Sequence, residues 1–132
     1  MADIFIVEDD LDLVETYADL LEANGHSVVC ASHISEATTY VMEMHPDIIT
    51  LDLNLPGNSS SAITSFIHNA TESGDSKIII ISGHPEMISG HTWMDQADLV
   101  LTKPVDNQHL LIMINRLLSL PKTALSAVHA RK

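Results

Sequence analysis

Four short runs of apolar, mostly β-branched residues constrain the fold of this chain most strongly: residues 4–7, 48–51, 78–81 and 99–101. Each run is apolar at consecutive positions, whereas a strand with one face in water alternates apolar and polar residues. Such strands must be covered on both faces, as in a parallel sheet with helices on its two sides. Residues 27–31 form a fifth, weaker strand candidate, supported chiefly by the turn pair Asn24-Gly25 before it.

Helical patterns lie between these strands. In residues 10–24 the apolar residues recur at helical spacing, Asp10 can cap the first turn, and Gly25 can end the helix. Further helices are predicted over residues 35–44, 60–71, 85–95 and 106–119. Strand-helix alternation of this kind predicts one α/β domain, a doubly wound (βα)5 three-layer sandwich with right-handed crossovers. We expect this domain to span residues 1–120 and residues 121–132 to form a short mobile tail.

The composition excludes several classes of partner. The chain has 132 residues, and its 18 acidic and 6 basic side chains give a formal net charge of −12. This charge disfavours direct binding to nucleic acid or to an anionic membrane. No apolar run approaches the roughly eighteen residues of a membrane helix, and the first residues do not resemble a secretory signal, so we expect a cytoplasmic protein.

Cysteine and histidine give little sign of metal or disulfide chemistry. The single cysteine, Cys30, has no intramolecular disulfide partner, and its apolar neighbours predict a small buried side chain. The seven histidines other than His84 show no short ligand spacing with cysteine or acidic residues. We therefore expect surface histidines and no zinc site.

Polar residues follow the predicted strands at the edge where open parallel sheets carry their functional sites. Glu8 and Asp9 follow the first strand, Asp52 ends the third, and Ser82 and Lys103 follow the last two. Two carboxylates a few ångströms apart repel by about 4 kcal/mol at an effective dielectric near 20, so the acidic cluster needs a cation or a proton. Oxygen ligands of this kind suit Mg²⁺, and a lysine suits an anionic phosphoryl oxygen.

The residues around these positions resemble the receiver domains of bacterial two-component response regulators, from about residue 4 to residue 120. Four motifs in the same order carry the resemblance: Ile6-Val7-Glu8-Asp9-Asp10, Leu51-Asp52-Leu53-Asn54-Leu55-Pro56-Gly57, Ile81-Ser82-Gly83 and Leu101-Thr102-Lys103-Pro104. The resemblance implies a flavodoxin-like fold whose five parallel strands have the order 2-1-3-4-5. It also implies a cis peptide bond between Lys103 and Pro104, an isomer that proline makes accessible.

The resemblance implies a role in phosphorelay signalling. Asp52 would accept a phosphoryl group from a histidine kinase or a phosphotransfer protein, with its carboxylate as the nucleophile. Lys103 and Ser82 would hold phosphoryl oxygens. The domain would catalyse its own phosphorylation and dephosphorylation, without being an enzyme for other substrates, and would switch a docking surface that a downstream protein reads.

The same resemblance implies a set of magnesium ligands. Asp9, Asp52 and the backbone carbonyl of Asn54 would hold Mg²⁺ directly, and Glu8 would act through a bound water. Mn²⁺ is a plausible substitute for Mg²⁺ at such a site.

Several positions depart from the family pattern or could tune it. Val100 stands where receivers commonly carry an aromatic residue, so the aromatic part of the usual switch is missing. Asn54 and His84 lie two residues beyond Asp52 and Ser82, positions that in this family flank the path of hydrolytic water. His84 either orients or obstructs that water or is a solvent-facing loop residue. In place of the common Asp-Gly pair, Ser59 and Ser60 offer hydroxyls that can cap the third helix.

The last predicted helix carries five consecutive apolar residues, 110–114, which cover more than one helical face. With Trp93 and Met94 near the fourth predicted helix, they indicate a partner or homodimer surface on the fourth and fifth helices. The alternative is a helix that is buried on several sides.

Other readings of the chain remain open. A phosphorylation-independent docking module, that is a degenerate receiver, would need none of the acidic chemistry. A phosphatase with an aspartate nucleophile would carry a second aspartate at the position where this chain has Asn54. A flavin-binding electron carrier would need a hydroxyl- and glycine-rich phosphate loop where Glu8, Asp9 and Asp10 would repel the phosphate.

Overall fold

The computed structural model describes residues 2–55, 59–72, 74, 76–83 and 96–120. The strands are β1 (Asp3–Val7), β2 (Ser27–Ala31), β3 (Ile48–Asp52), β4 (Lys77–Ser82) and β5 (Leu99–Thr102), and the helices are α1 (Leu11–Ala23), α2 (Ile34–Met44), α3 (Ser60–Glu72) and α4 (Asn107–Leu118). Each agrees with its predicted range to within one residue at either end. The helix predicted over residues 85–95 and the tail predicted over 121–132 lie outside the described residues.

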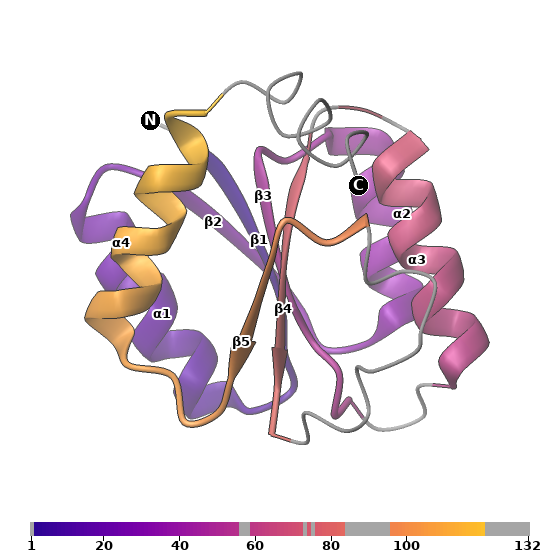
Figure 1. Ribbon diagram of the computed structural model, residues 1–132, viewed down its shortest axis with the longest axis horizontal. Coiled ribbons are helices and arrows are strands. Elements are labelled where there is room, and N and C mark those ends of the chain that lie inside the picture. Colours follow the sequence, from indigo (N-terminus) through magenta and orange to yellow (C-terminus); the bar gives the residue numbers. More distant parts are fainter. Residues whose placement is uncertain (1, 56–58, 73, 75, 84–95, 121–132) are drawn as a thin grey trace, which may run out of the picture.

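The five strands form one parallel sheet in the order β2-β1-β3-β4-β5. The predicted strand order, fold class and parallel pairing are therefore confirmed. The register places Asp52 of β3 opposite Ile81 of β4, and Ser82 of β4 opposite Thr102 of β5. The carboxyl ends of these three strands consequently lie at one edge of the sheet, at the bottom of Figure 1.

Helices cover both faces of the sheet, with α1 and α4 on one side and α2 and α3 on the other (Figure 1). Side chains of a strand point alternately to the two faces. Ile4 and Ile6 of β1 accordingly belong to the core cluster that contains residues of α1 and α4. Phe5 and Val7 belong to the cluster that contains residues of α2 and α3. The continuous apolar runs of the sequence thus fill two cores at once.

Side-chain caps set the starts of three helices. The Asp10 carboxylate accepts hydrogen bonds from the backbone N–H groups of Asp12 and Leu13, at 3.1 and 3.3 Å, as predicted for the first helix. Gly25 lies just beyond the end of that helix with a φ of 90°, a conformation that glycine adopts without strain. Asp106 caps α4 in the same way as Asp10 caps α1. The Ser59 hydroxyl accepts from the N–H of Ala62 at 3.1 Å, which confirms the predicted cap of α3.

The predicted burial of Cys30 is wrong. Cys30 is exposed, and its neighbour Val29 in β2 retains 40% of its accessible surface. β2 is hydrogen-bonded only to β1, because it is the end strand of the sheet. The helices cover the inner strands, and the side chains of an end strand are covered less completely.

Helix α4 is partly exposed on its apolar side. Leu110, Leu111, Ile114 and Leu117 are buried, whereas Ile112 keeps 49% of its surface exposed. The predicted excess of apolar surface is therefore present at Ile112. The homodimer remains a prediction, and the residues near 93 that supported it lie outside the described part of the chain.

The histidines that can be placed lie at or near the surface. His33, His45, His68 and His109 are exposed and His26 is half-buried, which confirms their predicted location. His84, His91 and His129 lie outside the described residues.

Among the described helices none combines the length and the apolar character that a bilayer span requires.

Candidate functional site

Four strand ends bring the predicted site residues to one edge of the sheet. Glu8 and Asp9 directly follow β1, and Asp52 is the last residue of β3. Ser82 is the last residue of β4, and Lys103 directly follows β5. The backbone N–H of Lys103 donates to the carbonyl oxygen of Ser82 at 2.9 Å, so hydrogen bonding between β4 and β5 continues into the site. The parallel sheet is thus what assembles residues that lie far apart in the sequence.

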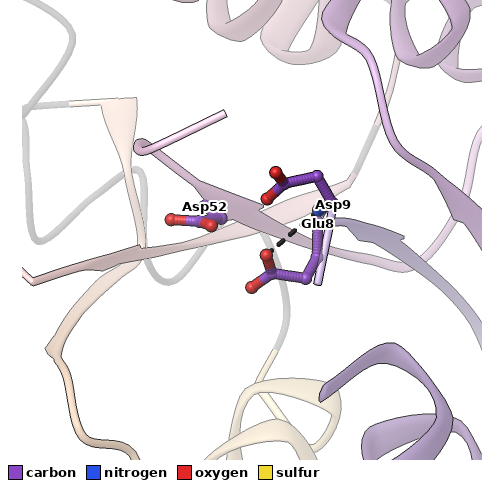
Figure 2. Close-up of side chains that lie close together, drawn as sticks. All are labelled: Glu8, Asp9 and Asp52. Carbon is purple, nitrogen blue, oxygen red and sulfur yellow. Dashed lines mark hydrogen bonds between the residues drawn. The ribbon is translucent and has the colours of Figure 1, made fainter. Parts of the chain in front are cut away.

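Three carboxylates converge at this edge. Glu8, Asp9 and Asp52 each contribute an oxygen that lies within 4.8 Å of the other two, and Figure 2 shows the side chains facing one another across the ends of β1 and β3. Glu8 and Asp52 are buried, with 4% and 3% of their surfaces exposed, whereas Asp9 is exposed. Burial makes their mutual repulsion costly unless a cation or a proton compensates for it.

Glu8 shows the effect of this crowding. Its Oε2 atom accepts hydrogen bonds from the backbone N–H groups of Asp9 and Asp10, at 3.0 and 3.1 Å. Burial, followed by a side-chain hydrogen bond with Asp52 and the negative charge of Asp52, raises the pKa of Glu8 to about 7. The N–H of Asp10 and the ammonium of Lys103 lower the pKa, but by less. Glu8 is therefore partly protonated near neutral pH in the absence of a metal ion.

Lys103 supplies a positive charge to the cluster. Its Nζ atom lies 3.2 Å from Oδ2 of Asp52 and 3.9 Å from Oε1 of Glu8. The peptide bond between Lys103 and Pro104 is cis, as predicted. With all three acids ionised, one ammonium leaves an excess of two negative charges, which one divalent cation would neutralise. Carboxylate oxygens on a rigid edge are the donors that Mg²⁺ prefers, so the residues fit a magnesium ion.

Asn54 and Ser82 lie at the same edge of the sheet as the acidic residues. The backbone N–H of Asn54 donates to Oδ1 of Asp52 at 3.0 Å, which leaves Oδ2 facing Lys103. Ser82 is fully buried at the end of β4. A Cβ atom added to Gly83 would lie 3.5 Å from Nδ2 of Asn54, so the loops after β3 and β4 approach each other closely. The two oxygens of Asp52 are thus held by two different loops.

Val100 and His84 were predicted to modulate the phosphorylation site. Val100 is half-buried in β5 and packs against the core cluster on the α2 and α3 face of the sheet. The place of the aromatic switch residue is therefore taken by a half-buried aliphatic side chain that packs against the core. His84 lies outside the described residues.

The sequence patterns did not identify Tyr17 as a neighbour of the site. Tyr17 was grouped with the apolar residues of the first helix, and it is indeed buried, with 3% of its surface exposed. Burial, and then the negative charges of Glu8, Asp52 and Asp10, raise its pKa. Its helical spacing from Leu13 and Leu21 signals that it faces the core, but that spacing alone gives no sign of its nearness to the acids.

The fold and the site together define a doubly wound parallel α/β domain with an acidic, lysine-containing centre at the carboxyl ends of its strands. The profile of the response regulator receiver domain family matches residues 4–115. The chain therefore belongs to this family, whose members act in two-component phosphorelay signalling and interact with histidine kinases or phosphotransfer proteins.

Individual relatives agree with this assignment. Protein PilH of Pseudomonas aeruginosa is 30% identical over 120 residues, which cover 90% of this chain and 99% of PilH. PgtA of Salmonella typhimurium, a transcriptional regulatory protein of a phosphoglycerate transport system, is 30% identical over 84% of this chain, but this chain spans only 26% of PgtA. The structure of the non-phosphorylated HemR receiver domain from Leptospira biflexa superposes with a TM-score of 0.76, at 26% identity, over 91% of this chain and 96% of that domain.

Proposed function

We propose that Asp52 is the residue that accepts the phosphoryl group. The proposal rests on the contacts of its two carboxylate oxygens. The Asn54 N–H donates to Oδ1 at 3.0 Å, and Lys103 Nζ lies 3.2 Å from Oδ2. An Asp52 oxygen would attack the phosphorus of a phosphohistidine on a partner protein. The phosphorus–nitrogen bond would break, and an aspartyl phosphate would form as the imidazole leaves.

Lys103 and Ser82 are proposed to bind the transferred group. The Lys103 ammonium already lies beside Asp52, and its four-carbon stem allows the charge to follow a phosphoryl oxygen. Ser82 ends the strand next to β3 and offers a hydroxyl at the same edge. Charge placed in advance near the reacting atoms is the main contribution of a protein to phosphoryl transfer.

The proposed magnesium ligands are Asp9, Asp52 and the backbone carbonyl of Asn54, with Glu8 acting through a bound water. Mn²⁺ would serve as a substitute. When bound, the ion would offset the excess negative charge of the site and the charge of the phosphoryl oxygens. The ring of carboxylates within 4.8 Å supports this assignment.

The proposed output is a change in a protein-docking surface. Phosphorylation of Asp52 would shift the equilibrium between two conformations that present different surfaces. Because Val100 cannot act as an aromatic switch, the change would travel through backbone shifts and aliphatic repacking. The half-exposed Ile112 of α4 supports a partner or homodimer surface on that helix. The single exposed thiol of Cys30 fits a reducing compartment, and we place the protein in the cytoplasm.

Intact mass spectrometry after incubation with acetyl phosphate tests the proposal directly. We expect a Mg²⁺-dependent adduct on the natural protein, stable in acid and labile in base, and no adduct on the Asp52→Asn variant. Asp19→Asn is a matched control, because Asp19 is an exposed acid on α1 away from the cluster. An adduct of equal yield on Asp52→Asn would refute the assignment of Asp52.

Autodephosphorylation is tested on the same adduct. After removal of acetyl phosphate, we expect the adduct on the natural protein to decay in the presence of Mg²⁺ and to decay more slowly in EDTA. Equal decay rates in the two conditions, or a rate no faster than that of the denatured protein, would contradict a catalysed reaction.

A further inference from the structure

A pocket of about 470 Å³ lies beside the acidic site, between α1 and the loop after β5. It is lined by Leu13, Tyr17, Gly83, Lys103, Pro104 and Val105. The walls are mainly apolar, and Lys103 and Tyr17 are the two lining residues whose side chains carry a polar group. A pocket of this size, with few polar groups, matches the dimensions and the character of small-molecule sites.

The Tyr17 hydroxyl distinguishes this pocket from an ordinary surface hollow. Tyr17 is 97% buried and yet makes no hydrogen bond with the described part of the chain. Buried hydroxyl groups in folded proteins nearly always have a partner, so one without a protein partner points to a water molecule or a ligand. Since burial and the nearby acids raise the pKa of Tyr17, the phenol keeps its proton at neutral pH and can donate a hydrogen bond.

The surrounding charges determine what kind of molecule the pocket favours. Lys103 lies 3.2 Å from Asp52 and 3.9 Å from Glu8, so without a metal ion its charge is already offset by these two acids. Asp10 and Asp12 at the start of α1 add further negative charge nearby. Without a metal ion, an anionic ligand in this pocket would therefore be repelled, whereas a neutral apolar molecule would displace water from apolar walls.

We propose that this pocket binds a neutral, mainly apolar small molecule that carries a hydrogen-bond acceptor, with the Tyr17 hydroxyl as the donor. The aliphatic stem of Lys103 forms part of the wall, and its ammonium belongs to the acidic site. A ligand in the pocket restricts this stem, and Lys103 then follows the phosphoryl group less freely. Occupancy therefore slows phosphorylation of Asp52, a consequence that rests on the proposed function.

Benzamide is a suitable probe, because it combines a phenyl ring with a neutral amide carbonyl. We expect saturable changes in the ¹H–¹⁵N spectrum at Leu13, Tyr17 and Val105 when the full chain is titrated with benzamide. Tyr17→Phe, which removes only the hydroxyl, should weaken binding by about fivefold, the value of one net hydrogen bond. Benzoate, which has the same shape and a negative charge, should bind more weakly than benzamide.

Two further variants show whether benzamide binds in this pocket. Tyr40→Phe removes the hydroxyl of a tyrosine on α2, on the other face of the sheet, and should leave the affinity for benzamide unchanged. Val105→Phe fills the pocket and should abolish binding while the circular dichroism spectrum stays native. The proposal is overturned if the natural protein shows no saturable change, or if Tyr17→Phe binds as well as the natural protein.

The link to phosphorylation has its own measurement. At saturating benzamide the rate of adduct formation with acetyl phosphate should fall at least twofold in the natural protein and should not change in Val105→Phe. An unchanged rate in the natural protein overturns the link but leaves the binding result standing. Failure of the natural protein to form any adduct without benzamide overturns the proposed function instead.

Discussion

The fold buries the carboxylate of Glu8 and places it beside that of Asp52. Its pKa in the folded protein is about 7, whereas the ordinary value is 4.5. Between these values the folded state keeps a proton that the unfolded state has lost. The contribution of Glu8 to stability is therefore greatest below pH 4.5 and is lost as the pH rises to about 7.

This reasoning predicts how stability depends on pH without metal ions. In EDTA, the free energy of unfolding should fall between pH 4.5 and 7, with Glu8 accounting for at most about 3 kcal/mol of the fall. Urea unfolding at several pH values measures this fall in the free energy of unfolding. Glu8→Gln should show a smaller fall, and the exposed control Glu15→Gln should follow the natural protein. Identical profiles for Glu8→Gln and the natural protein would contradict the raised pKa.

Magnesium should reverse this dependence. A divalent ion favours the ionised form of the carboxylates, so binding releases the Glu8 proton and strengthens as the pH rises from 6 to 8. We expect the Mg²⁺ affinity, measured by isothermal titration calorimetry, to rise over this range in the natural protein and to change much less in Glu8→Gln. An affinity that is independent of pH would count against Glu8 as part of the metal site.

Among the elements, α4 offers a direct comparison of buried and exposed residues of the same type. Ile114 is fully buried, whereas Ile112, two residues earlier, is 49% exposed. Ile114→Ala should lower the free energy of unfolding by about 2–5 kcal/mol, because it leaves a cavity. Ile112→Ala should cost much less, roughly 0.5 kcal/mol. Denaturant titrations of the two variants test this, and a large loss for Ile112→Ala would mean that another chain covers this residue.

The start of α4 carries a second prediction at this scale. The Asp106 carboxylate accepts from the N–H groups of Gln108 and His109, at 2.8 and 3.2 Å. Asp106→Ala removes this cap and should cost about 1 kcal/mol of unfolding free energy. The exposed neighbour Gln108 provides the control, because Gln108→Ala preserves the cap. Equal costs for the two variants would show that the cap contributes nothing.

The elements also show which features could be predicted from the sequence. Strands and helices were predictable because apolar runs and caps such as Asp10 are local signals. The exposure of Cys30 has no such local signal, since it depends on β2 being the end strand of the sheet. The place of Tyr17 was missed for a similar reason, because its pocket is formed with residues 103–105, far along the chain.

At the scale of the whole molecule, the net charge of −12 favours expansion of the chain by self-repulsion. Dissolved salt screens this repulsion over distances of about 10 Å at 0.1 M. We predict that raising NaCl from low concentration to about 0.3 M in EDTA increases the melting temperature by a few degrees. A double variant, Glu15→Lys with Asp19→Lys, should depend less on salt, because each substitution changes the charge by two. Equal salt dependence would contradict the proposed role of net charge.

Assembly of the site from four strand ends has a consequence for the chain during its synthesis. The three carboxylates are all present once residue 52 has been made, but the ammonium that lies beside Asp52 belongs to residue 103. A nascent chain that lacks β5 therefore carries the acids without their lysine, and it cannot form the complete site on the ribosome. Under the proposed function, competence to receive a phosphoryl group would arise only when the last strand has joined the sheet, and an unfinished copy would not compete with finished ones for that group.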